Sequence, residues 1–157
     1  MIRAADIDDV LALNAACVPE VGAVDRIALT AIVNEASLAT LLRDAEGALA
    51  FVIALSPTAD YGSLNFAWFR DHYARFLYVD RIAVAARARG RGLGKRLYQE
   101  VFAAARAQGD PIVTCEVNLL PPNPDSLAFH ARLGFRRVGE LQHVPGEKEV
   151  AMLIADA

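Results

Sequence analysis

The stretch Arg89-Gly90-Arg91-Gly92-Leu93-Gly94 lies between an apolar segment, Phe76 to Ala85, and a predicted amphipathic helix from Leu93 to Gly109. Alternating glycines let a backbone approach a ligand closely, and the first turn of a helix has N–H groups without partners. Such a helix start attracts anions through its dipole. The stretch therefore predicts a strand, a phosphate-binding loop and a helix in succession. The alternative is a glycine-rich turn whose basic side chains are merely solvated.

Basic side chains gather around this loop, although the whole chain has a net charge of −3 and a pI near 5.6. The cluster consists of Arg81, Arg87, Arg89, Arg91, Lys95 and Arg96. The one acid close to it is Asp80. A local positive field on an acidic chain favours a small polyanion over a nucleic-acid backbone as the ligand.

Two common phosphate loops do not fit these residues. A Walker loop requires glycine five residues before its Gly-Lys pair and Ser or Thr after it, but Arg89 and Arg96 stand there around Gly94-Lys95. A dinucleotide-binding loop that starts at Gly90-x-Gly92 requires Gly or Ala where Lys95 stands, and no early βαβ unit surrounds it. Neither kind of nucleotide site is expected here.

The remaining pattern, Arg89-x-x-Gly92-x-Gly94, resembles the acetyl-CoA motif of the GNAT superfamily of N-acetyltransferases, which is Gln or Arg followed by x-x-Gly-x-Gly or Ala. The preceding Asp80 to Val84 is similar to the family's fourth strand. The segment Asn123 to Phe135 is similar to its later helix, which contains Asn and ends in Gly-Phe. The resemblance is specific over about residues 76 to 140 and topological before them. It implies the acyl-CoA N-acyltransferase fold and the use of acetyl-CoA.

Hydrophobic periodicity and turn residues place the other elements. We predict helices over Ile7–Val18, Asp25–Glu35 and Asp125–Leu133, and strands over Met1–Ala4, Leu38–Arg43, Ala48–Leu55, Phe76–Ala85, Pro111–Val117, Phe135–Gln142 and Glu149–Ile154. Asp6 is expected to cap the first helix. The apolar Ala48–Leu55 strand is expected to be central and covered on both faces. This order predicts an α/β fold with a mixed, mostly antiparallel central sheet and one parallel strand-helix-strand crossover.

Residues 56–75 show no clean periodicity, and a loop of this length in a compact domain is either functional or an unrecognised element. The part from Tyr61 to Tyr73 contains the single tryptophan and several other aromatic residues. We interpret it as a pocket or lid for the acceptor. The alternative is that the aromatic side chains pack the loop down or form a contact in a homodimer.

The chain is expected to form one domain over residues 1–157. Apolar residues make up 55% of it and charged residues 22%, which is typical of a folded globular protein. Cys17 and Cys115 lack CxxC spacing and fit the core of a protein in a reducing compartment. The sequence has no signal peptide and no apolar run of about 20 residues. We therefore expect a cytoplasmic protein without membrane contacts.

By position, the resemblance assigns an acetyl-CoA site. The expected cofactor-binding residues are Ile82, Ala83, Val84, Arg89, Gly90, Arg91, Gly92, Leu93, Gly94, Lys95, Asn123, Phe129, His130 and Arg132. The strand residues would bind the pantetheine arm through their backbone, as an added strand does. The glycine loop would hold the pyrophosphate, and Asn123 would bind the pantetheine or orient the acceptor. The last three would flank the far side of the cofactor, although Phe129 also fits an ordinary core position.

The implied reaction is direct attack of an amine on the thioester, which needs a base, a proton for the sulfur and no metal. Glu116 is the preferred base, because relatives that acetylate protein N-termini carry a strand glutamate there and a charge in an apolar strand needs a reason. Asp80 is the second choice, with a salt bridge to Arg81 as the alternative. For the acid, many relatives have a tyrosine just before the final Gly-Phe, where this chain has His130. A hydrogen-bonded structural histidine is the alternative.

Together the residues predict an N-acetyltransferase that moves the acetyl group of acetyl-CoA to a primary amine, here a small molecule or an amino acid. The replacement of the tyrosine by His130 motivates an alternative, a sensor or regulatory module that binds acyl-CoA without turnover. A nucleic-acid-binding domain is disfavoured by the acidic pI.

Overall fold

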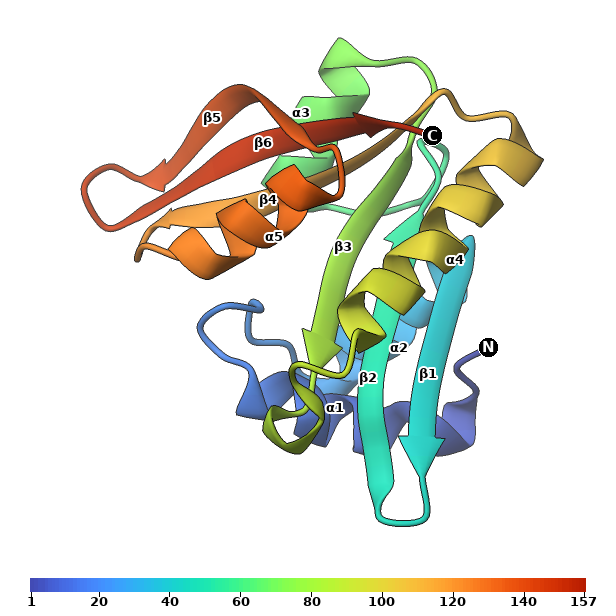
Figure 1. The fold of residues 1–157 in the computed structure, drawn as a ribbon. Coiled ribbons are helices and arrows are strands. Elements are labelled where there is room, and N and C mark those ends of the chain that lie inside the picture. The colour runs from blue at the N-terminus through green and yellow to red at the C-terminus, as the bar shows by residue number, and fades with distance from the viewer.

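The computed structural model describes residues 1–157, and its centre is one six-stranded sheet with the strand order β1-β2-β3-β4-β6-β5 (Figure 1). The strands are β1 (Leu38–Asp44), β2 (Gly47–Leu55), β3 (Leu77–Val84), β4 (Ile112–Leu120), β5 (Arg136–Val144) and β6 (Lys148–Asp156). Neighbouring strands are antiparallel except for β3 and β4, which are parallel. The helix between those two strands forms the crossover. This topology confirms the predicted mixed, mostly antiparallel sheet.

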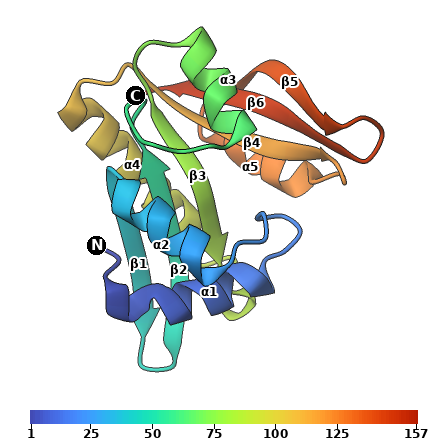
Figure 2. The same ribbon diagram turned by 180° about the vertical axis from the view of Figure 1, so that it is seen from behind.

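Five helices cover the two faces of the sheet. They are α1 (Ile7–Ala16), α2 (Arg26–Glu35), α3 (Leu64–His72), α4 (Leu93–Gln108) and α5 (Pro124–Arg132), with short 3-10 turns at Ala4–Asp6 and Ala86–Ala88. Figure 2 shows α1, α2 and α3 in front of the sheet, and Figure 1 shows α4 and α5 in front of the opposite face. Each face therefore has its own layer of helices and its own core.

Strand β2 divides the hydrophobic core into two parts. Its residues Phe51 and Ile53 pack into the cluster beneath α1, α2 and α3, whereas Ala50 and Val52 pack into the cluster beneath α4 and α5. All four side chains are fully buried. Successive residues of a strand point to opposite faces, so an apolar strand suits a position covered on both sides. The prediction of a central, doubly covered strand is confirmed.

Strands β3 and β4 are paired over a very short distance. The recorded partners are Leu77 with Val113 and Tyr78 with Thr114, after which the two strands separate and the sheet opens into a V (Figure 1). From Val79 onward β3 has a strand partner only in β2, so the N–H and C=O groups on its other edge face the opening. Exposed strand edges of this kind can pair with an extended ligand.

Helix α3 is the element that the periodicity of residues 56–75 did not reveal. Ser63 begins it, because its Oγ accepts the N–H of Phe66 at 3.4 Å. Phe66 and Phe69 lie on its buried face, whereas Trp68 stacks on His72 with their ring centroids 3.8 Å apart. Aromatic residues on both faces hide the helical period. Both interpretations of this segment apply in part: its buried rings pack onto the protein, and Tyr61, Ser63, Leu64 and Asn65 line the main cleft.

The N-terminus differs from the prediction in two details. Met1–Ala4 was expected to be a strand, but the chain makes only an isolated bond from Ile2 N to Ala39 O at 2.8 Å and then enters a 3-10 turn. Asp6 was expected to cap the first helix, but its carboxylate accepts the N–H of Arg3 at 2.8 Å and makes no cap bond to α1. The short loop closed by Arg3 and Asp6 bends the chain away from the sheet, so a strand cannot form.

Two replacements in α2 should show how much burial, as distinct from helix propensity, contributes to the free energy of unfolding. Leu29 is 0% exposed and Ile27 is 83% exposed on the same helix. Leu29→Ala should lower the free energy of unfolding by about 2–5 kcal/mol, because it removes packed methyl groups and leaves a cavity. Ile27→Ala should change it by less than about 0.5 kcal/mol. Urea unfolding followed by circular dichroism measures both; equal losses would show that α2 is not docked as described.

Candidate active site

A cleft of about 720 Å³ opens where β3 and β4 separate. Its walls come from both strands, from the loop between α1 and α2, from α3 and α5, and from the β5–β6 hairpin. The predicted site residues that line it are Asp80, Ile82, Arg89, Glu116, Asn123, Phe129 and His130. The divergence of the two strands thus brings the predicted base, acid and cofactor-binding residues into one cavity. Ala83, Val84 and the loop 90–95 continue from its wall, and Arg132 is exposed on α5 without lining it.

The glycine loop has the conformation that its sequence requires. Gly90 and Gly92 both have φ of 75°, in the left-handed region that residues with a Cβ rarely adopt. Gly92 is the residue before α4, and the first hydrogen bond of the helix runs from Arg96 N to Gly92 O at 3.0 Å. The N–H groups of Leu93, Gly94 and Lys95 therefore stay free at the positive end of the helix.

A third glycine lets α4 and α5 approach each other beside the loop. A Cβ placed on Gly94 would lie 3.2 Å from the Phe129 ring, closer than an ordinary contact. Phe129 is half-buried, packs against the core beneath α4 and α5, and also lines the cleft. Phe129 therefore packs in the core and lines the cleft at the same time, so its two predicted positions do not exclude each other.

The basic cluster divides into paired and unpaired cations. Three of its members form ion pairs: Arg81 with Asp80, Arg87 with Asp44 and Glu46, and Arg96 with Glu100. The other three, Arg89, Arg91 and Lys95, are exposed and make no ion pair. These unpaired cations lie on the glycine loop and the first turn of α4, beside the free N–H groups. The loop is therefore built to receive an anion such as a pyrophosphate.

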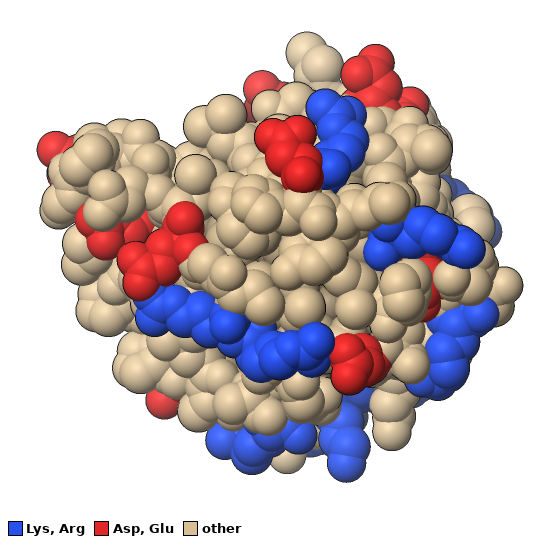
Figure 3. Space-filling model, turned by 90° about the horizontal axis from the view of Figure 1, so that it is seen from above, with Lys and Arg blue, Asp and Glu red and all other residues tan.

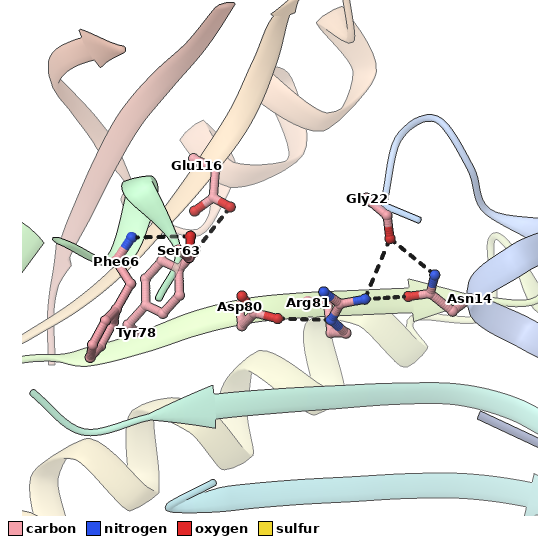
Figure 4. Close-up of polar contacts among 8 residues, drawn as sticks. All are labelled: Asn14, Gly22, Ser63, Phe66, Tyr78, Asp80, Arg81 and Glu116. Carbon is pink, nitrogen blue, oxygen red and sulfur yellow. Dashed lines mark hydrogen bonds and ion pairs between the residues drawn. The ribbon is translucent and has the colours of Figure 1, made fainter. Parts of the chain in front are cut away.

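Glu116 points from β4 across the gap toward β3 (Figure 4). The hydroxyl of Tyr78 donates to its Oε1 at 3.0 Å, whereas its Oε2 is buried and has no hydrogen-bond partner. Burial is the largest cause that raises the pKa of Glu116 to about 8, and the charge of Asp80 raises it further, whereas the hydrogen bond from Tyr78 and the Asn65 side chain lower it. A buried polar atom without a partner is uncommon and points to a ligand or a catalytic role.

Asp80 occupies a β-bulge in β3. Ile53 of β2 pairs with Arg81 and Ala54 pairs with Val79, so Asp80 is the extra residue between them. Its carboxylate is only 4% exposed and accepts the Nε–H of Arg81 at 2.8 Å. The salt bridge that was the alternative to a catalytic Asp80 is therefore present.

His130 is buried and uses both ring nitrogens inside the protein. Nδ1 lies 2.7 Å from Ser126 O, which can only accept, so Nδ1 carries the proton and Nε2 accepts from the Tyr98 hydroxyl at 2.7 Å. Burial lowers the pKa of His130, which favours this neutral form. Asn123 begins the same helix, because its Oδ1 accepts the N–H of Ser126 at 3.3 Å.

Two further hydrogen bonds join residues that line the cleft. Asn118 Nδ2 donates to Pro19 O at 3.2 Å and thereby ties the α1–α2 loop to β4. His143 Nε2 donates to Asn65 Oδ1 at 2.7 Å and ties β5 to α3. The wall of the cleft is therefore held together by residues from four separate segments.

Sequence reasoning missed several residues that line the cleft or, like Tyr78, contact a residue that lines it. Tyr78 and Tyr98 lie in a strand and a helix that were predicted, and each is 0% exposed. A hydroxyl group within an otherwise apolar strand or helix face was the only signal, and it does not distinguish a core tyrosine from a site residue. Asn118 and His143 come from segments far apart in the chain, so only the fold brings them together with Asn65 of the predicted acceptor segment.

In the view of Figure 3, basic and acidic side chains are interspersed and do not form one basic surface. No three His, Cys, Asp or Glu side chains gather closely enough to bind a metal ion. No helix has both the length and the hydropathy needed to cross a membrane.

Comparison with known proteins shows extensive structural likeness. The ribosomal-protein-S18-alanine N-acetyltransferase from Escherichia coli superimposes with a TM-score of 0.76 at 16% identity, over 99% of this chain and 90% of that one. Ard1 from Thermoplasma volcanium gives 0.80 at 15% identity, over 99% and 94%. Naa20 from Chaetomium thermophilum, bound to a bisubstrate analogue, gives 0.76 at 18% identity, over 99% and 84%. At these identities the likeness establishes a shared fold.

The sequence itself matches a family model. No curated protein sequence matches the chain. The model described as the "Acetyltransferase (GNAT) family" matches residues 22–135, which include the glycine loop, β3, β4 and α5. Because this match spans most of the chain and agrees with the fold, the chain belongs to the GNAT family of acetyltransferases.

Proposed function

We propose that this protein transfers the acetyl group of acetyl-CoA to the primary amine of a small acceptor, with Glu116 as the base. The observation that carries this proposal is the buried, unpartnered Oε2 of Glu116 in a cleft that begins at an anion-binding helix start. An amine that enters the cleft would supply the missing hydrogen-bond donor. Membership of an acetyltransferase family supports the donor, and the cleft connects the donor site to the base.

The donor would lie along β3 and against the start of α4. The free N–H groups of α4 and the exposed Arg89, Arg91 and Lys95 would bind the pyrophosphate. The unpaired edge of β3 from Val79 to Val84 would bind the amide groups of pantetheine, as an added strand would. Gly94 leaves room for the Phe129 ring beside the start of α4, because a larger residue there would displace Phe129.

Glu116 has a pKa that suits both halves of the reaction. As a carboxylate it removes a proton while the amine nitrogen bonds to the acetyl carbon and the carbon–sulfur bond breaks. The resulting carboxylic acid has a pKa of about 8, close to that of an ordinary thiol at about 8.5. The proton can therefore pass on to the sulfur with little change in free energy.

His130 is less well placed for the acid step than its sequence position implies. In its neutral form it has no N–H directed at the cleft, because Nδ1 donates to Ser126 and Nε2 accepts from Tyr98. To donate, it must first be protonated at Nε2, and burial lowers its pKa. We keep His130 as a candidate acid, and Glu116 as the group that needs no such rearrangement.

We favour a small acceptor because the acceptor must share a cleft of about 720 Å³ with the donor. The bond between Asn118 and Pro19 and the bond between His143 and Asn65 each join two residues that line this cleft. The name of the E. coli neighbour points to a protein N-terminus as its own acceptor. A peptide amine is therefore the rival to a small amine.

A panel of amines tests the proposed acceptor class. We expect release of free CoA thiol with small primary amines or amino acids, at higher kcat/KM than with a decapeptide that begins with alanine. A decapeptide preferred by tenfold or more would transfer the assignment to protein N-termini. Tight binding of acetyl-CoA with no thiol release from any amine would identify a sensor without turnover.

The glycine loop should be essential for donor binding. Gly92→Trp introduces a side chain at a left-handed position directly before α4, where the pyrophosphate would lie, and should abolish CoA binding in isothermal titration calorimetry. Gly47→Trp is the matched control, because Gly47 also has a positive φ and open space around it but lies in the β1–β2 turn. Both should lose stability by about 1–2 kcal/mol, and only the first should lose CoA.

The pH dependence of turnover should report Glu116. The base acts as a carboxylate, and its pKa is raised to about 8, so below pH 8 Glu116 should add about a tenfold rise in kcat/KM per pH unit to the rise caused by the acceptor amine, and above pH 8 only the contribution of the amine should remain. Glu116→Gln should lower kcat by about 10²–10⁴-fold and leave CoA binding intact. In that variant only the titration of the acceptor amine should remain; an unchanged rate would falsify Glu116 as the base.

A further inference from the structure

Arg81 is a buried cation in the wall of the cleft. Its side chain is 8% exposed, and that of its partner Asp80 is 4% exposed. A buried ion pair must recover the cost of desolvation through good geometry and further hydrogen bonds, and an apolar pair is often at least as stable. The position of this pair in the catalytic cleft therefore requires an explanation beyond stability.

The guanidinium group of Arg81 connects two parts of the cleft (Figure 4). On one side, Nε donates to Asp80 Oδ2 at 2.8 Å. On the other, one terminal nitrogen donates to Asn14 Oδ1 at 3.0 Å and to Gly22 O at 3.4 Å. Asn14 Nδ2 also donates to Gly22 O at 3.1 Å. Arg81 thus joins β3 to α1 and to the loop between α1 and α2.

Both sides of this network lie next to residues of the cleft in which we propose that the reaction takes place. Asp80 lies near Glu116 in the cleft, and its charge is the largest cause after burial that raises the pKa of Glu116. Gly22 belongs to the loop whose residues Pro19 to Gly22 line the opposite end of the same cleft. Arg81 is the one cation that contacts both, so a change at Arg81 affects the base and the acceptor side together.

We propose that Arg81 is a positioning residue for acetyl transfer: it neutralises Asp80 beside Glu116 and holds the α1–α2 loop in place at the acceptor side. The proposal rests on Glu116 as the base of the proposed function. It accounts for the bulge at Asp80, because the extra residue places a carboxylate where Arg81 can bind it and where its charge raises the pKa of Glu116.

Other ionisable groups around Glu116 would not cause the same shift in its titration midpoint. Burial raises the pKa of Tyr78, Tyr61, Tyr98 and Cys115, so they stay protonated near pH 8. Burial also lowers the pKa of the two cleft histidines, which come from α5 and β5, so both are neutral there. The remaining charged residues that line the cleft are Glu20, Arg89, Asp125 and Lys148. The variants below leave all of these side chains unchanged.

The electrostatic half is tested by NMR on protein labelled with ¹³C at the glutamate carboxyl carbon, with the Glu116 signal assigned by its loss in Glu116→Gln. This measurement needs no acceptor. Asp80→Asn should move the midpoint of Glu116 to lower pH by about one pH unit, because a nearby negative charge is removed. Arg81→Gln should move it to higher pH, because Asp80 is then left unneutralised. Asp44→Asn, which removes another arginine-paired carboxylate far from Glu116 along the sheet, should leave it unchanged.

The anchoring half is tested by hydrogen exchange of the loop over residues 17–25. Arg81→Lys keeps the charge but has a single ammonium group in place of the planar fork, so it cannot hold Asp80 and Gly22 at once. Exchange of this loop should become at least about threefold faster, while the midpoint of Glu116 stays within about 0.3 of the wild-type value. Arg87→Lys is the control, because Arg87 pairs with Asp44 on the surface and makes no contact with the loop.

The outcomes separate this inference from the function on which it rests. Opposite shifts in Asp80→Asn and Arg81→Gln, with faster loop exchange in Arg81→Lys, would support it. An unmoved midpoint in both charge variants, or unaltered exchange in Arg81→Lys, would overturn it even if Glu116 proves essential for turnover. If Asp80→Asn does not fold, as judged by circular dichroism and CoA binding, the upward shift in Arg81→Gln decides the electrostatic half. Normal turnover in Glu116→Gln would instead reject the proposed base.

Discussion

The separation of β3 and β4 after two paired residues is the constraint on which the rest of the site depends. A continuous sheet would satisfy the backbone of both strands and would leave no cavity between them. Here the edge of β3 is left open, and the gap is lined by residues from α3, α4, α5 and the strands β3 to β6, together with the loop between α1 and α2. On either side of β2 the core consists of buried apolar side chains, which hold the two halves of the sheet in place around the opening.

The cleft also concentrates the electrostatic features of the molecule. Half of the basic cluster around the glycine loop is neutralised by carboxylates, and the unpaired half lies at the start of α4. Deeper in the cleft, the ion pair of Asp80 and Arg81 lies beside a glutamate that prefers to be protonated near neutral pH. One end of the cleft is therefore suited to a permanent anion, and the middle to a group that gains and loses a proton. That order matches a phosphorylated donor with a reactive far end.

Local patterns and long-range contacts differ in how well they could be predicted. The loop before α4 was predictable because glycine, arginine and a helix start act within ten residues, and Gly90 and Gly92 have the positive φ that such a loop needs. The bounds of most strands followed from apolar runs ended by turn residues. Helix α3 was missed because Trp68 and His72 stack on its outer face and obscure the period. The first strand was predicted wrongly because Arg3 and Asp6 close a local turn that competes with pairing.

The glycine loop, the mixed sheet with one crossover and the short list of ionisable residues could be found from local patterns, because each is encoded by neighbours along the chain. The contacts among those residues depend on the fold. Tyr78 meets Glu116, Tyr98 meets His130, and Arg81 meets Gly22 across distances in sequence that no local pattern spans. Protonation depends on burial and on neighbouring charges, and both are properties of the folded cleft. Glu116 could therefore be selected from the sequence, whereas its raised pKa follows only from the folded structure.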